Sequence, residues 1–238
     1  MILCTSITQS YLERSKPFFE SAVKFIDCQK VCFTINFDCN IPGWHTLRVD
    51  YTPEWSPTNR DNYASLQHGL FIKHLECDAK EMILFCDSDM ILQRQFPDIA
   101  YRNEICVTEC SFPALKLHQA IDNIKGNPLA KQGVVNRDEF CAAWICMSAE
   151  NWKLFYSHVE RNIAYLSYFT HHAAWQVFIN VIALNFSLCR LPDNICNAVW
   201  YEGTRAVQEG GMLMIHDQLR SNAPVYFNHN KFNKDGLE

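Results

Sequence analysis

Apolar segments of the strand type and the helix type alternate along the first third of the chain. "MILCTSI" predicts a buried strand, and residues 11–26 carry apolar side chains at helical spacing. A second strand, "VCFTINF", ends at Asp38, and a helical pattern over residues 63–75 leads into the strand "MILFC". Strand, helix, strand, helix, strand in this order predicts an α/β fold with a parallel sheet.

The later two thirds of the chain are less regular. "EICVTE" and "FCAAWICM" predict strands, and Ser148 is a plausible N-cap for a helix that has Glu150 in its first turn. A further helix is expected over residues 173–184, and "NAVWY" and "MLMIH" predict short closing strands. Since no repeat or low-complexity linker interrupts the chain, we expect a single domain over residues 1–238, with a polar tail from about residue 221.

The overall composition is that of an ordinary globular protein. Hydrophobic residues make up 48% of the chain and charged residues 20%, which argues against disorder. The formal net charge is -5, and no run of five or more basic residues occurs. We therefore expect no nucleic acid partner.

The twelve cysteines favour a reducing environment. No pair has C-x-x-C spacing, and several cysteines stand inside apolar runs, where a free thiol behaves as a small hydrophobic side chain. The N-terminal residues predict a strand without a basic leader, and no apolar run reaches the roughly 18 to 20 residues that span a bilayer. We expect a cytoplasmic protein without a transmembrane segment.

Two acidic residues follow the third apolar strand, in "FCDSDMIL". Asp87 and Asp89 stand between two apolar runs, where a carboxylate is costly to bury without a positive partner. In sheets of this type, ligands bind beyond the carboxyl ends of the strands. Two aspartates one residue apart occur by chance in many chains of this length. Asp87 and Asp89 are therefore also compatible with a strand end whose carboxylates are solvated. The apolar context favours a hard divalent cation held by carboxylate oxygens.

A third metal ligand is expected from a distant part of the chain. His216 ends the apolar segment "MLMIH", and an imidazole beside two carboxylates favours Mn²⁺, with Mg²⁺ as the alternative. A hydrogen-bonded histidine at a strand end is the other interpretation of this residue.

The combination of "FCDSDMIL" with the late "MLMIH" resembles glycosyltransferases of the GT-A fold, most closely those of family 8. The resemblance covers residues 1 to about 217. It implies a Rossmann-like mixed sheet flanked by helices, and a metal-dependent transfer of sugar from a nucleotide-diphosphate donor, a UDP-sugar above all. It also implies that Asp87, Asp89 and His216 hold the metal. Thr5 and Ser6 would then face the nucleotide, with Asp38 near its base or ribose.

The expected chemistry needs positive charge at the donor's diphosphate. A bound cation neutralises the leaving group as a Lewis acid. Arg60, in "TNRDNY", would add a further positive contact near the phosphates, although it is equally a surface residue at a helix start.

Two segments depart from the family pattern. "FCAAWICM" stands in place of an Asn-Ala-Gly run, but Ala142 and Ala143 still allow close approach of a sugar. In "HHAAWQVFIN", Gln176 matches the glutamine of the family's Asp-Gln pair, and Trp175 stands where the acid would be. The contacts to the donor sugar, and with them the choice of sugar, therefore stay open.

The acid–base residues stay open at this point. An inverting enzyme needs a carboxylate base at the acceptor hydroxyl, and Asp138 and Glu139 are the nearest candidates. A retaining enzyme would instead place Gln176 near the reacting face. Trp44 and Trp55 are the two tryptophans that we expect to stack on a sugar or base.

Two other functions are compatible with the sequence. One is a catalytically inactive protein of the same fold that binds a nucleotide sugar or glycan. The other is a magnesium phosphatase like the haloacid dehalogenases, whose two aspartates also follow an apolar strand. The acceptor, the sugar and the oligomeric state cannot be inferred from the sequence.

Overall fold

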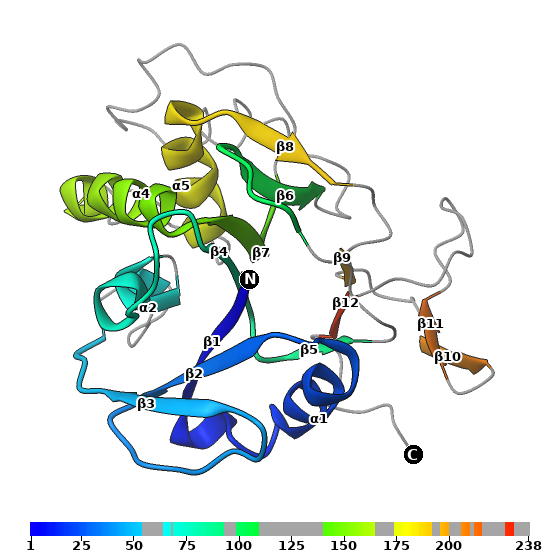
Figure 1. Cartoon of the computed structure of the whole chain (residues 1–238). Helices are drawn as coiled ribbons and strands as arrows, with labels where there is room; N and C mark the ends of the chain where they lie inside the picture. Colours follow the sequence, from blue (N-terminus) through cyan, green and yellow to red (C-terminus); the bar gives the residue numbers. More distant parts are fainter. Residues whose placement is uncertain are drawn as a thin grey trace.

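The computed structural model describes residues 1–53, 64–67, 69–92, 99–109, 140–164, 174–191, 196–199, 206–209, 212–215 and 227–230. A seven-stranded mixed sheet with helices on both faces forms the centre of this part of the chain (Figure 1). The strand order is β3-β2-β1-β4-β7-β6-β8. Their bounds are Ile2–Thr8 for β1, Gln29–Ile35 for β2, His45–Val49 for β3, Met82–Cys86 for β4, Ile105–Glu109 for β6, Phe140–Ser148 for β7 and Leu188–Arg190 for β8.

The first four strands of this sheet are parallel, so their carboxyl ends meet at one edge. Strand β7 then runs antiparallel to both β4 and β6, and β8 is parallel to β6. Every residue of β4 and of β7 is buried, which explains why these strands are apolar without alternation. The predicted α/β class with a mixed sheet is confirmed.

One face of the sheet is covered by α1 (Lys16–Phe25), and the other by α2 (Ala64–Gln67), the 3₁₀ helix η2 (Leu70–His74), α4 (Ala149–Asn162) and α5 (Ala174–Ile182). Two separate apolar cores result. In the first, Phe18 of α1 packs with Leu3 and Leu84, whereas in the second Trp152 of α4 packs with Phe71 and Phe85.

The helix boundaries follow local chemistry. Pro17 lies in the first turn of α1, where its missing N–H costs nothing, and the residues before it form the 3₁₀ helix η1 (Gln9–Tyr11). The second predicted helix is divided at Gly69, whose φ of 130° is unfavourable for other residues. Ser148 caps α4 as predicted, because its Oγ accepts the Asn151 N–H at 3.3 Å.

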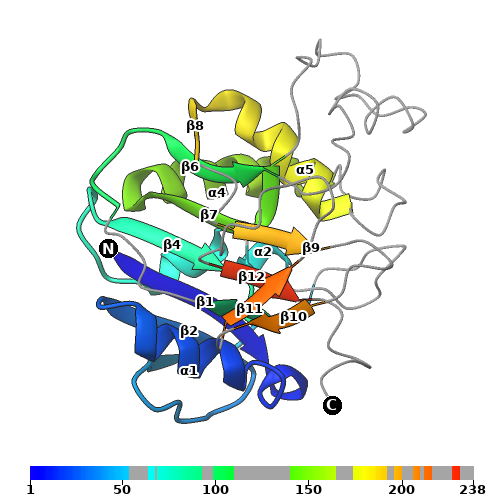
Figure 2. The same cartoon turned by 90° about the vertical axis from the view of Figure 1, so that its right-hand side faces the viewer.

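A second region begins where the chain leaves the large sheet after β4. Strand β5 (Met90–Leu92) joins a three-stranded sheet in the order β5-β12-β9, with β12 at Phe227–Asn230 and β9 at Cys196–Val199. Strands β10 (Ala206–Glu209) and β11 (Met212–Ile215) pair only with each other among the described strands. In Figure 1 the three-stranded sheet lies between the large sheet and the β10–β11 pair, and in Figure 2 both stand in front of the large sheet.

One predicted ligand contact is wrong. The Trp44 ring is buried between Phe18 and Phe19, with ring centroids 5.5 and 5.2 Å away, and its indole N–H donates to the Phe19 carbonyl at 3.3 Å. Trp44 therefore belongs to the core and cannot stack on a sugar. In the part of the chain that the structure describes, no helix is long and apolar enough to cross a membrane.

The 3₁₀ helix η5 (Ala183–Asn185) ends α5 and leads to β8.

Candidate functional site

The Asp87–Asp89 turn connects β4 of the large sheet with β5 of the small one. The Asp87 N–H donates to the Ala143 carbonyl of β7 at 2.9 Å, and the Met90 N–H donates back to the Asp87 carbonyl at 3.4 Å. Ser88, between the two acids, is buried, whereas both acids are half-buried. The neighbouring strands thus fix the backbone of this turn, and both carboxylates belong to the carboxyl edge of the sheet.

The end of β1 lies directly beside this turn. The Thr5 hydroxyl is buried and donates to the Cys86 carbonyl at 2.8 Å, so it ties β1 to the residue before Asp87. Ser6 is 5% exposed, and its Oγ has no hydrogen-bond partner among the described residues. A buried hydroxyl without a partner is costly, so Ser6 Oγ lacks a hydrogen bond that buried polar groups normally make.

A cation that the sequence analysis missed lies next to Asp89. Arg14 Nη2 is 4.0 Å from Asp89 Oδ2, with the Asp89 side chain 13% exposed and that of Arg14 33% exposed. The same guanidinium lies over the exposed ring of Tyr11, 5.5 Å from its centroid. The signal in the sequence was the basic residue in "QSYLERS", the segment that follows the first strand. This segment starts at the edge of the sheet where Asp87 lies.

Gln176 of α5 reaches the first residues of β7. Its Oε1 accepts the Ala142 N–H at 2.8 Å, and its Nε2 donates to the Phe140 carbonyl. Asn180, one turn later, accepts the Phe140 N–H at 2.9 Å. These amides satisfy the backbone of β7 where it extends past the end of β4.

The predicted residues of the inner site therefore lie in one connected group. Ala143 contacts the Asp87 backbone, its neighbour Ala142 contacts Gln176, and Thr5 contacts Cys86. Both alanines are buried, at 8% and 7% exposure.

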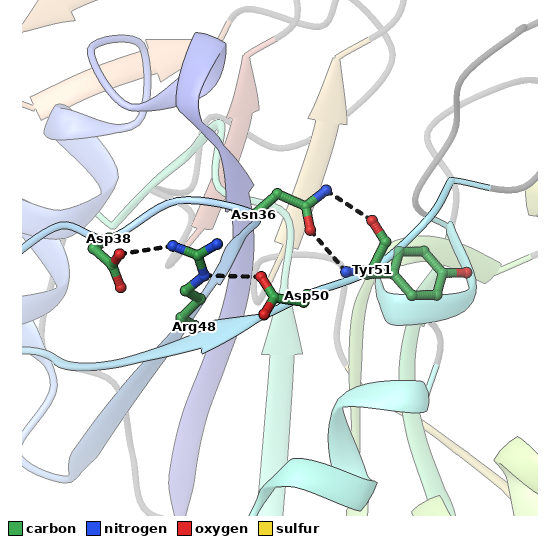
Figure 3. A network of polar contacts seen from close by, with 5 residues as sticks. All are labelled: Asn36, Asp38, Arg48, Asp50 and Tyr51. Atoms are coloured by element: carbon green, nitrogen blue, oxygen red, sulfur yellow. Dashed lines mark hydrogen bonds and ion pairs between the residues drawn. The ribbon is translucent and has the colours of Figure 1, made fainter.

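Asp38 lies in a different cluster, which Figure 3 shows. Arg48 Nη1 is 2.7 Å from Asp38 Oδ2, and Arg48 Nε is 2.8 Å from Asp50 Oδ1. These hydrogen bonds, the one to Asp50 first, raise the pKa of Arg48 above its ordinary value. Asn36, with a φ of 61°, joins the ends of β2 and β3 because its side-chain amide bonds both backbone groups of Tyr51. The structure therefore gives Asp38 an ion-pair partner of its own, in a cluster at the ends of β2 and β3.

Five predicted residues lie outside the described residues, so they stay predictions. These are Arg60, Asp138, Glu139, His216 and Trp55. The described backbone does show where another histidine lies: in the antiparallel pairing of β12 with β5, His229 is opposite Met90, the residue after Asp89.

The acids at this turn fit a hard divalent cation in their chemistry, because carboxylate oxygens at a strand end are ligands that Mn²⁺ and Mg²⁺ accept. Among the side chains that the structure describes, no group of three His, Cys, Asp or Glu residues gathers around a common point. A metal at this turn would take two ligands from Asp87 and Asp89 and would need a third from elsewhere.

The comparisons with known proteins concern the fold. No protein-family model and no curated protein match the sequence. A crystal structure of the galactosyltransferase LgtC in complex with donor and acceptor sugar analogs is similar with a TM-score of 0.54 and 12% identity, over 83% of this chain and 76% of that one. An active-site mutant of LgtC, with glutamate in place of a glutamine, is similar with a TM-score of 0.58 and 14% identity, over 97% of this chain and 87% of that one.

At this level of identity the likeness establishes the fold. The mixed seven-stranded sheet with helices on both faces is the GT-A fold of LgtC, as the sequence predicted.

Proposed function

We propose that this chain is a metal-dependent glycosyltransferase that moves a sugar from a nucleotide-diphosphate donor, a UDP-sugar in the first instance, to an acceptor. The observation that carries the proposal is the position of Asp87 and Asp89. They form the turn at the carboxyl end of β4, beside the end of β1, in a fold that LgtC shares. LgtC was crystallised with donor and acceptor sugar analogs, which supports a sugar-transfer role for the fold here.

Asp87 and Asp89 would hold the metal, Mn²⁺ or as the alternative Mg²⁺. When bound, such an ion neutralises the negative charge that develops on the departing diphosphate. The anchoring of the turn to β7 through the Asp87 N–H supports this role, since a metal site needs ligands whose backbone does not move.

The third ligand is a choice between two histidines. His216 directly follows β11, which pairs with β10, whereas His229 lies in β12, which pairs with the strand that begins one residue after Asp89. His216 stays the proposed third ligand, as the sequence predicted, and His229, opposite Met90 in the backbone register, is the second candidate.

Replacing each histidine by alanine separates the two assignments. We expect alanine at the histidine that ligates the metal to weaken Mn²⁺ binding by at least the roughly 10- to 100-fold that loss of an outer-shell partner costs, and alanine at the other histidine to change it by less than about twofold. The measurement is a titration of Mn²⁺ followed by the paramagnetic resonance signal of the free ion. A loss in His216→Ala alone would support His216, a loss in His229→Ala alone would support His229, and no loss in either variant would contradict a histidine ligand.

The donor would lie along the carboxyl ends of β1 and β4. The Ser6 hydroxyl has no partner among the described residues, and a ligand oxygen at this edge would satisfy it. Thr5 acts differently, since its hydroxyl is already bonded to Cys86 and positions the turn. Asp38, bound to Arg48, contributes to the donor site only if the ion pair opens.

Gln176 is the candidate for contact with the reacting sugar. The Gln176 Oε1 accepts the Ala142 N–H, and the next residue, Ala143, accepts the Asp87 N–H, which supports this role. LgtC also has a glutamine in its active site. Because the Gln176 amide also holds the start of β7, a substitution there would affect the position of Ala142 as well. Asp138 and Glu139 stay candidates for the base of an inverting reaction.

A donor screen tests the proposal. The protein with Mn²⁺ is incubated with a panel of UDP- and GDP-sugars, and release of the nucleotide is measured with and without EDTA. We expect release from one UDP-sugar and its loss in EDTA. Binding of UDP and Mn²⁺ without release over hours would support the inactive binding protein instead, and hydrolysis of a simple phosphate ester would support a phosphatase.

A further inference from the structure

The carboxylate of Asp89 is partly neutralised within the chain. Arg14, in the segment between η1 and α1, brings its guanidinium to 4.0 Å from Asp89 Oδ2. Since the Asp89 side chain is only 13% exposed, the two charges are less screened by water than a surface pair would be. A cation that approaches Asp87 and Asp89 therefore meets the positive charge of Arg14.

The contact between Arg14 and Asp89 is loose. A charge-assisted hydrogen bond between a guanidinium and a carboxylate measures about 2.7–2.9 Å, as the two bonds of Arg48 do at 2.7 and 2.8 Å. At 4.0 Å, Arg14 gives Asp89 an attractive charge without a closed hydrogen bond. Its guanidinium also lies over the Tyr11 ring, so a partly exposed aromatic surface supports the side chain independently of Asp89.

A nucleoside diphosphate changes which anion Arg14 prefers. A guanidinium binds phosphate oxygens in a fork geometry at least as well as it binds a carboxylate. Under the proposed function, the diphosphate would reach the same acidic turn together with the metal, which would supply the positive charge that Asp89 needs. Arg14, 4.0 Å from Asp89, would then be free to bind phosphate oxygens.

We propose that Arg14 binds the donor's diphosphate and that, when no nucleotide is bound, Arg14 competes with the divalent cation for Asp89. This inference rests on the proposed function. Its consequence is coupled binding: the metal alone binds weakly because Arg14 opposes it, and the nucleotide strengthens metal binding because the diphosphate draws Arg14 away. Metal and nucleotide must each raise the affinity of the other by the same factor.

The test compares wild type, Arg14→Gln, Arg14→Lys and the matched control Lys16→Gln. Lys16 lies nearby in the chain but pairs with Glu13 on the surface, the two side chains being 56% and 79% exposed. The affinity for Mn²⁺ is measured by paramagnetic resonance without nucleotide, and the affinity for UDP by calorimetry at saturating Mn²⁺. Thermal denaturation checks that each variant is folded.

We expect Arg14→Gln to bind Mn²⁺ alone about tenfold more tightly and UDP with Mn²⁺ about tenfold more weakly, within the usual range of coupling between sites. Arg14→Lys keeps the positive charge, so its affinity for Mn²⁺ alone should equal that of wild type. Lys16→Gln should match wild type in both measurements. A merely structural role of Arg14 would move both affinities in the same direction.

The inference is overturned if Arg14→Gln leaves both affinities unchanged or weakens both. A different result would count against the proposed function: wild-type protein that takes up neither Mn²⁺ nor UDP. Wild-type binding with normal coupling in Arg14→Gln would leave the function standing and remove the role of Arg14.

Discussion

Two pairs of acidic residues with an arginine lie at the carboxyl edge of the same parallel strands, and their surroundings differ. In the outer pair, Asp38 and Asp50 follow β2 and β3, their side chains are 79% and 77% exposed, and both bind Arg48 at less than 3 Å. In the inner pair, Asp87 and Asp89 follow β4, both are half-buried, and Arg14 lies 4.0 Å from Asp89.

The difference shows that the environment of a carboxylate pair, more than its spacing in the sequence, makes it a candidate site. The outer acids are solvated and bonded to Arg48, so a metal would gain little there. The inner acids stand on a turn that β7 anchors, between buried residues, where charge needs a strong partner. Of these two pairs, the inner one is the proposed metal site.

The largest expected effect separates the two pairs by activity. Asp89→Asn should reduce metal-dependent release of nucleotide by about 100- to 1000-fold, because it removes a contact that stabilises the charge of the transition state. Asp38→Asn is the matched control in the outer pair, and we expect it to remain within about threefold of wild type. Release is measured with the best donor from the screen. Equal losses in both variants would mean that the outer pair belongs to the site.

A smaller effect is expected on stability. Thr5→Val removes the donor to the Cys86 carbonyl in the buried inner region and should lower the free energy of unfolding by about 1–3 kcal/mol. The control is Thr46→Val near the outer pair, whose hydroxyl donates to the partly exposed Cys39 carbonyl at 3.0 Å, where water can replace it. Urea denaturation of both variants gives the comparison. A larger loss for Thr46→Val would contradict the assignment of Thr5 as the residue that positions the turn.

The smallest effect concerns two thiols, each beside an acid. Burial first and Asp87 second raise the pKa of Cys86 well above its usual value, and burial followed by Asp38 raises that of Cys39. Since the native state keeps these protons while the unfolded chain ionises near pH 8.5, the thiols stabilise the fold below that pH and lose this effect as the pH rises through their native pKa values.

Ionisation of buried Cys86 should then lower the free energy of unfolding by up to about 1.4 kcal/mol per pH unit above pH 8.5, and that of partly exposed Cys39 by less, because water screens it. In native protein at pH 8, iodoacetamide should modify Cys39, which is partly exposed, long before buried Cys86. Peptide mass mapping over time checks the order. Early modification of Cys86 would show that the inner region opens to solvent.

The sequence predicted the parts of the fold that depend on local pattern. Apolar periodicity gave β1, α1, β2 and β4, and the Ser148 cap gave the start of α4, because these signals lie within a few residues of each other. Strand β3 was missed because it is short and mostly half-exposed or exposed. Strand β12 was missed because "FNHN" is polar, and its pairing with β5 joins residues that are far apart in the chain.

The same division holds for the site. The resemblance implied that Thr5 faces the nucleotide, which stays a prediction; what the structure shows is that its hydroxyl donates to the Cys86 carbonyl, directly before the Asp87 turn. Arg14 could not be placed in this way, since its position depends on the irregular path between η1 and α1. Trp44 was misplaced for the opposite reason: it lies in a loop by sequence but fills the core against α1.

The most direct measurement is the uptake of Mn²⁺ by the wild-type protein and by the double variant Asp87→Asn/Asp89→Asn, both with UDP present. The account predicts stoichiometric binding to wild type and loss of that binding in the double variant, while both unfold at similar temperatures. Failure of wild type to take up Mn²⁺, or equal uptake by a folded double variant, would contradict it.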